Sequence, residues 1–249
     1  MEGARILKDS QIIVLGVCIA VATIVSSLIL SKGFLKVMKF TQQVISVTGS
    51  AQQNIKSDYI VWNGGFTSRE ADLPSAYKKL QADLVLVLAY LEGKGVKKEE
   101  VIVSQISTGK IFKKTKDGKE TNDLEAYELS QWIEVRSNDV DRIDVVSRQA
   151  TELINQGVVF VSGAPNYFYT KLDELKIEML AKATQNAKER AVNMVKATGN
   201  KIGYMRSAKM GVFQITPVNS TEVSDWGVND STSLEKRVTA VVNVSFAID

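Results

Sequence analysis

The sequence predicts an α+β protein with a single N-terminal transmembrane helix. Three features point to this class: an uncharged apolar run near the N-terminus, several segments in which apolar residues alternate, and one long helical pattern between strand-like segments. Residues 1–39 are the predicted membrane anchor with basic flanks. Residues 40–249 are the predicted soluble domain, with elements in the order β-β-α-β-β-α-β-α-β-β.

The apolar run is IIVLGVCIAVATIVSSLIL, residues 12–30. It contains 19 residues without a charge, and a helix of that length spans roughly 28 Å, close to the thickness of a bilayer core. A cleaved signal peptide is the alternative, but its apolar part is usually about 7 to 15 residues long and ends at small residues. We therefore expect an uncleaved anchor, with these residues facing lipid: Ile12, Ile13, Leu15, Val17, Val21, Ile24, Val25, Leu28 and Leu30.

The excess positive charge lies beside this apolar run. Residues 1–39 hold five of the 31 Lys and Arg residues and two of the 28 Asp and Glu residues, so residues 40–249 are balanced. Cations at the ends of a membrane helix suit lipid headgroups, and no basic domain is left to bind nucleic acid. We expect membrane lipid as a partner and exclude nucleic acid.

Residue types needed for common catalysis are missing. The chain has no histidine, and its one cysteine, Cys18, lies inside the apolar run. This removes the commonest general base, the commonest zinc ligand and any disulfide. Asp225, Asn229 and Asp230 carry oxygen ligands suited to calcium but match no known ligand loop. We expect no enzymatic activity, no cofactor and no metal.

The first half of the domain reads as strands, a helix and a hairpin. Strands are predicted over residues 44–48 and 59–67, with a bulge or bend at Gly64 and Gly65. A strand over residues 101–112, a charged tip over residues 113–123 and a returning strand over residues 124–136 follow. Between them, a helix opened by Pro74 has this predicted apolar face: Tyr77, Leu80, Leu84, Val87, Leu88 and Leu91.

The second half contains two helices. The first is capped by Asn138 or Asp139 and ended by Gly157, with a predicted buried stripe of Val140, Ile143, Val146, Ala150, Leu153 and Ile154. The second lies within residues 167–203, and its predicted face is Leu172, Leu175, Met179, Ala183, Ala187, Ala191, Met194 and Thr198. Because Ala183, Ala187 and Ala191 have small side chains, we expect a sheet or a second helix to approach this face of the helix closely.

The C-terminal part holds a long polar loop and a final strand. The loop covers residues 217–236 and contains Trp226 as its one large apolar residue. Loops of this length usually bind something, cover something or are mobile. The strand over residues 237–248 is predicted to bury one face, made of Val238, Ala240, Val242, Val244 and Phe246.

Several of these segments together resemble the SIMPL-domain family of bacterial envelope proteins. They are the strand VISVTGSAQQNIKSD (residues 44–58), the hairpin strand containing Tyr127, and the Ala- and Lys-rich helix followed by GNKIG. The resemblance covers residues 44–249. The departures are Ser50 and Ala51 in place of a Gly- and acid-rich turn, and Ser57 where a proline is common.

The resemblance implies an extracytoplasmic α+β protein of poorly defined biochemistry. The family is linked with envelope stress, and some members form large, hollow, channel-like homo-oligomers. The resemblance implies no catalytic residues. It also implies a single-pass protein of the cell membrane, with the short N-terminus inside and residues 44–249 outside.

Two functional hypotheses follow from these observations. The first is a non-enzymatic, membrane-anchored protein that assembles with itself into a ring, cage or channel. Its predicted contacts are Tyr127, Trp132 and Trp226, in the hairpin strand and the long loop. The second is a monomeric or dimeric binding module that captures a protein or ligand through residues 217–236.

Overall fold

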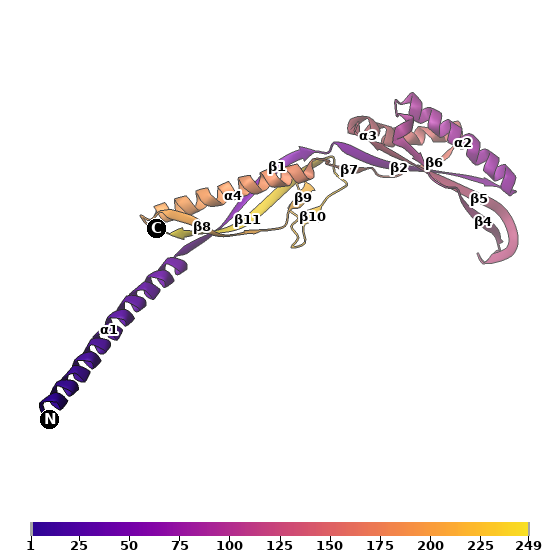
Figure 1. The fold of residues 1–249 in the computed structure, drawn as a ribbon. Helices are drawn as coiled ribbons and strands as arrows, with labels where there is room; N and C mark the ends of the chain where they lie inside the picture. The colour runs from indigo at the N-terminus through magenta and orange to yellow at the C-terminus, as the bar shows by residue number, and fades with distance from the viewer. Residues whose placement is uncertain (1, 249) are drawn as a thin grey trace. The chain divides into compact units, whose positions relative to one another are not determined.

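The computed structural model describes the backbone of residues 2–248 and the side-chain surroundings of residues 14–38 and 43–248. It confirms the α+β class and the order of the main elements (Figure 1). The elements are α1 (Glu2–Gln42), β1 (Val44–Lys56), β2 (Tyr59–Glu70), α2 (Leu73–Gly93), η1 (Lys98–Glu100), β3 (Val101–Val103), β4 (Ser107–Lys114), β5 (Glu120–Ser137), α3 (Val140–Gln149), η2 (Ala150–Gln156), β6 (Val159–Ser162), β7 (Asn166–Phe168), α4 (Leu172–Lys196), β8 (Ile202–Met210), β9 (Gln214–Pro217), β10 (Val228–Asn229) and β11 (Glu235–Ile248).

Helix α1 is longer than the apolar run that the sequence suggested. Its described part contains one stretch, residues 14–38, that is long and apolar enough to cross a membrane. This stretch ends eight residues beyond the predicted end at Leu30, and its apolar side chains are exposed. The predicted lipid-facing residues from Leu15 to Leu30 all lie in it. The side chains of Ile12 and Ile13 lie outside the described residues.

The chain divides into two compact units. Unit 1 contains residues 1–51, 180–211 and 241–249, and unit 2 contains residues 52–179 and 212–240. One sheet has the order β1-β11-β9-β10, with β8 also paired to β11. The other sheet has the order β3-β5-β2-β6, with β4 paired to β5 and β7 paired to β2.

Unit 2 is built around the long antiparallel pair of β2 and β5, whose register runs from Ile60 opposite Ser137 to Glu70 opposite Tyr127. Helices α2 and α3 lie on one side of this sheet (Figure 1). Large side chains fill the space between sheet and helices, and the largest buried ones include Trp62, Phe66, Ile60, Leu80, Leu91, Leu129, Ile133, Ile143 and Leu153. This is a conventional close-packed core.

Gly64 and Gly65 make room for aromatic rings, in contrast to the predicted bulge or bend. The register of β2 with β5 and β6 runs through both residues without a shift. A Cβ added at Gly64 would come within 3.2 Å of Phe160 ring carbons, and one added at Gly65 would lie 2.9 Å from a ring carbon of Trp132. The two glycines therefore accept one ring on each face of the sheet.

Three details of the helix and hairpin predictions were wrong. Tyr77 and Leu88 are exposed, because the buried stripe of α2 runs through Ala76, Leu80 and Val87. Ile154 is exposed because the helix changes to the tighter 3₁₀ form after Gln149, which rotates the following residues. In addition, the strand predicted over residues 101–112 is divided into β3 and β4.

Unit 1 packs the C-terminal part of α4 against β1. The predicted small stripe is confirmed, since Ala183, Ala187 and Ala191 are all buried. A Cβ added at Gly49 of β1 would collide with the Ala183 carbonyl oxygen and the Ala187 N–H, so helix and strand are in direct backbone contact. Met194 was predicted to be buried but is exposed, and Val195 is buried in its place.

Candidate interaction site

Strand β8 is the most exposed of the described strands in unit 1. Among the residues that the structure describes, it pairs only with β11, from Val242 opposite Met210 to Ile248 opposite Ile202. Every side chain from Tyr204 to Met210 is exposed, with Tyr204 at 82% and Met210 at 58%. The strand therefore presents both a free edge and an uncovered apolar surface.

The position of α4 explains why β8 is uncovered. Polar contacts hold the helix on β1: the Arg190 guanidinium donates to the Thr48 carbonyl at 2.9 Å, and the Ser50 N–H donates to Asn186 Oδ1 at 3.2 Å. Strand β11 lies between β1 and β8. An open groove remains between α4 and β8, lined by Leu180, Ala181, Thr184, Gln185, Lys188, Ile202, Gly203, Met205 and Phe246.

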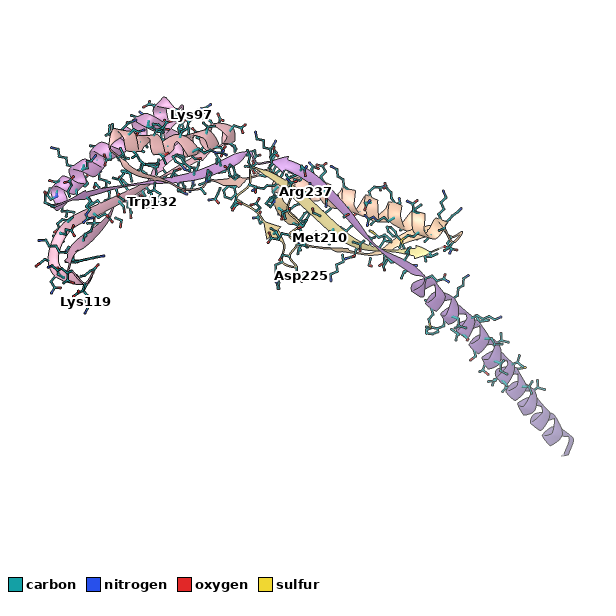
Figure 2. All side chains as sticks on the ribbon, turned by 180° about the vertical axis from the view of Figure 1, so that it is seen from behind. Lys97, Lys119, Trp132, Met210, Asp225 and Arg237 are labelled. Carbon is teal, nitrogen blue, oxygen red and sulfur yellow. The ribbon has the colours of Figure 1, made fainter. Side chains whose placement is uncertain are left out.

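Trp132 makes a second exposed apolar feature, on unit 2. Its ring lies over Gly65 on the side of the sheet away from α2 and α3, and it is 49% exposed (Figure 2). The register places Val161 of β6 across Gly65 from Trp132, and Val161 is also exposed. Trp132 and Val161 therefore form an exposed apolar row across this face.

The loop of residues 217–236 is held in place by two buried polar side chains. Gln214 Nε2 donates to the Ser224 carbonyl at 2.7 Å, and Gln214 Oε1 accepts from the Val228 N–H at 3.0 Å. Lys236 is buried and donates to the carbonyls of Tyr167, at 2.6 Å, and Asp230. Burial lowers the pKa of Lys236, although the nearby Asp230 carboxylate acts in the opposite direction. The fixed loop leaves Trp226 94% exposed.

A buried tyrosine joins β7 to α3. The Tyr167 hydroxyl donates to Asp144 Oδ1 at 2.6 Å, and Arg148 forms an ion pair with the same carboxylate at 2.8 Å. Burial raises the pKa of Tyr167 to about 12, and the bond to Asp144 adds to this shift. The group stabilises unit 2, because its members contact one another and leave no free acid or base.

The residues considered for calcium do not form a cluster. Asp230 Oδ1 accepts from the N–H and the hydroxyl of Thr232, whereas Asp225 and Asn229 are exposed. Within residues whose surroundings are described, no group of three or more His, Cys, Asp and Glu side chains is arranged to hold a metal ion.

Comparison with known protein families decides which family the chain belongs to. A family model described as "SIMPL: Protein of unknown function (DUF541)" matches residues 45–246. The chain belongs to the SIMPL family. The match includes parts of both units and begins after α1, so the family is defined by the sheets and their helices.

Other comparisons add little to this SIMPL chain. A search of curated proteins finds no match. Among solved structures, a hydantoinase/carbamoylase family amidase from Burkholderia ambifaria is similar at 12% identity and a TM-score of 0.26. The similarity covers 53% of the SIMPL chain and 35% of the amidase chain. It supports no conclusion about fold or activity.

The three predicted contact residues of the SIMPL chain lie in different surroundings. Tyr127 packs against the core of unit 2, Trp132 lies on the opposite face of the same sheet, and Trp226 extends from the long loop. Whether any of them touches a partner stays a prediction.

Sequence reasoning missed two features of the SIMPL chain. The exposed apolar side chains of β8, including Met205 and Met210, carried no signal, because an alternating strand reads the same whether it is covered or not. Lys236 did carry one: it is two residues before Val238, in phase with the buried face of β11. A lysine at such a position needs buried partners.

Proposed function

We propose that the chain is a non-enzymatic, membrane-anchored protein of the cell envelope that assembles with itself into a ring-, cage- or channel-like homo-oligomer. In this proposal α1 crosses the membrane and residues 44–249 lie on the extracytoplasmic side. The observation that carries the proposal is the uncovered strand β8. Membership of the SIMPL family is consistent with it.

A free strand edge of this kind favours pairing with another chain. Natural sheets protect their edges with charged residues, bulges, proline, short strands or covering elements. Strand β8 has Arg206, Lys209 and two register shifts against β11, but it is nine residues long, contains no proline and is exposed. Within the described residues its outer edge has no strand partner, and the groove beside it offers Met205 and Phe246. Both features suit a strand and its side chains from another copy.

The other edge of the same sheet, β1, is open only in part, because Arg190 and Asn186 of α4 already bond to the Thr48 carbonyl and the Ser50 N–H. Strand β1 stands at the end of the strand order and, within the described residues, pairs only with β11. A contact between β8 of one copy and β1 of the next is head-to-tail. Such contacts produce rings when the rotation between copies closes, and filaments when it does not.

The test is the particle mass of the full-length protein in mild detergent, with negative-stain images of the same sample. We expect a discrete multiple of 27.4 kDa with a ring or cage outline. Met210→Glu should reduce the mass to that of small particles, because it adds a charge to the apolar surface of β8. Val159→Glu is the matched control, since Val159 is equally exposed on β6. A monomeric or dimeric wild-type protein would overturn the proposal.

A binding module is the second candidate, and Trp226 is the observation that favours it. Gln214 and Lys236 fix the loop of residues 217–236, yet the indole is almost completely exposed. Aromatic side chains held in this way are common in binding sites. This candidate predicts small particles and a capture activity that Trp226→Ala removes. Deletion of residues 219–231 without a change in oligomer size would show that the loop makes no subunit contact.

A further inference from the structure

The distance along the chain from the membrane anchor to unit 1 is very short. The apolar stretch of α1 ends at Met38, the helix ends at Gln42, and β1 begins at Val44. Four helical residues and one extended residue span at most about 9 Å. The headgroup layer on each side of a bilayer is roughly 5 to 8 Å thick. Residues 14–38 span about 38 Å, which exceeds a hydrocarbon core by about 8 Å. In a helix centred on the core, Gln43 therefore lies roughly 5 to 8 Å outside the headgroups, a distance that long lysine side chains can bridge.

Hydrogen bonds connect this junction to the turn between α4 and β8. The Ile248 N–H at the end of β11 donates to the Gln43 carbonyl at 3.0 Å, and Ile248 is paired with Ile202 at the start of β8. Residues 197–201, which join α4 to β8, directly precede Ile202. In Figure 1 the ends of α4 and β11 lie near the junction of α1 and β1. The same end of unit 1 thus carries both the anchor and this turn.

The segments that meet there have a one-sided charge. No acid occurs between Asp9 and Asp58 or between Glu189 and Glu222, whereas the second interval contains Arg190, Lys196, Lys201, Arg206 and Lys209. Asp249, which follows Ile248 in the sequence, is the one acid that adjoins these segments. The overall balance of residues 40–249 therefore conceals a local excess of cations.

The exposed side chains of the turn suit a lipid surface. Lys196 and Lys201 are exposed, as are the apolar Met194 and Tyr204 on either side of the turn. Lysines at this height reach phosphates with their amines and apolar atoms with their stems. Tyrosine is enriched at the same level of membrane proteins because its ring is apolar and its hydroxyl is polar.

We propose that the α4–β8 turn rests on the membrane that holds α1, with Lys196 and Lys201 binding anionic lipid headgroups and Tyr204 lying at the interface. The proposal rests on the anchoring part of the proposed function and does not depend on the oligomer. In this proposal unit 1 contacts the bilayer surface through the turn, in addition to its attachment through α1.

The experiment uses the full-length protein in lipid nanodiscs whose phospholipid headgroups carry a nitroxide quencher. A fluorophore is attached at Asn200→Cys, in the turn, or at Lys209→Cys, both with Cys18→Ser. Residue 209 is seven residues, about 23 Å, further along β8 than Ile202. We expect the nitroxide to quench the fluorophore at position 200 and to leave the fluorophore at position 209 almost unquenched. Quenching of both labels or of neither would overturn the proposal.

Two further measurements separate the sources of failure. The native Cys18, labelled in the wild-type chain, should be quenched by a nitroxide on the acyl chains. Without that quenching the anchor itself is wrong and the proposal fails with it, whereas quenching at Cys18 without quenching at position 200 overturns the proposal alone. The double substitution Lys196→Gln and Lys201→Gln should abolish the quenching of the fluorophore at position 200 in phosphatidylglycerol nanodiscs. Unchanged quenching at position 200 would contradict the role of the two lysines.

Discussion

The two units use opposite ways of packing a helix on a sheet. In unit 2, α2 and α3 bury large side chains such as Leu80 and Ile143 against Trp62 and Phe66. In unit 1, α4 presents Ala183 and neighbouring alanines to Gly49, so that backbone meets backbone. The first arrangement buries much apolar surface, whereas the second buries little and brings the helix close to one strand.

The difference explains where exposed apolar surface remains. The side chains of unit 2 fill a continuous core on the helix side of its sheet. In unit 1 the close contact with β1 holds α4 on one side of the sheet, and β8 keeps a free edge and uncovered side chains. We infer that unit 2 supplies most of the stability of the chain and that unit 1 supplies its contacts with other molecules and with the membrane.

The largest expected effect is loss of a core ring in unit 2. Phe66→Ala should lower the free energy of unfolding by about 4 kcal/mol, since Phe66 is 1% exposed and a cavity remains. Urea unfolding of the full chain in mild detergent measures it, followed by tryptophan fluorescence in a Trp132→Phe, Trp226→Phe background in which Trp62 is the remaining tryptophan. Phe168→Ala is the control, because Phe168 is 43% exposed. Equal effects of the two substitutions would contradict the assigned core.

A larger side chain at position 49 should lower the stability of unit 1 selectively. Gly49→Val forces α4 away from β1, which we expect to destabilise unit 1 by about 3 kcal/mol. Faster hydrogen exchange of α4 amides, with an unchanged Trp62 transition, is the expected signature. Gly109→Val is the matched strand control, since a Cβ at Gly109 has only an ordinary contact of 3.6 Å. Unchanged exchange in α4 would show that the close contact is absent.

Tyr167 gives the stability of unit 2 a pH dependence. Its pKa is raised from 10.0 to about 12 in the folded chain, so the native state keeps a proton that the unfolded state loses. The stabilisation is present below about pH 10 and is lost as the pH rises to about 12. Tyr167→Phe should cost about 2 kcal/mol at neutral pH, since the bond is to a charged carboxylate, and the difference from wild type should shrink across this window. Tyr77→Phe is the exposed control, and a difference that stays constant with pH would refute this role.

The smallest expected effect on stability is at Trp226. Trp226→Ala should change the free energy of unfolding by less than about 0.5 kcal/mol, because the side chain is 94% exposed. The urea midpoint followed by Trp62 fluorescence measures this change. A clear loss of stability would mean that the indole packs against the protein, and would weaken the binding-module candidate.

The sequence predicted helix α4 better than its neighbours for a physical reason. Alanines at four-residue intervals fix one face, so Ala183, Ala187 and Ala191 were placed correctly. Met194 was misplaced because the period of 3.6 allows two choices near the end of a helix, and Val195 takes the buried position. Ile154 was misplaced because nothing in the local sequence announces the change to a 3₁₀ turn.

The candidate site was less predictable than the fold. Its main feature is a missing neighbour beside β8, and pattern alone does not say which strands lie at an edge. Trp132 was selected as a contact residue for its type and position, but its place over Gly65 depends on the register of β5 with β2. Burial of Lys236 was the one site feature that alternation along β11 would have revealed.

Hydrogen exchange of the β8 amides in the full-length protein tests the central claim most directly. In a single chain the N–H groups on the free edge of β8 have no strand partner and should exchange quickly. If β8 pairs with another copy, we expect protection along residues 202–210 that matches β11 and disappears in Met210→Glu. Rapid exchange of the outer β8 amides in the intact wild-type protein would contradict the account, because it would leave the edge uncovered.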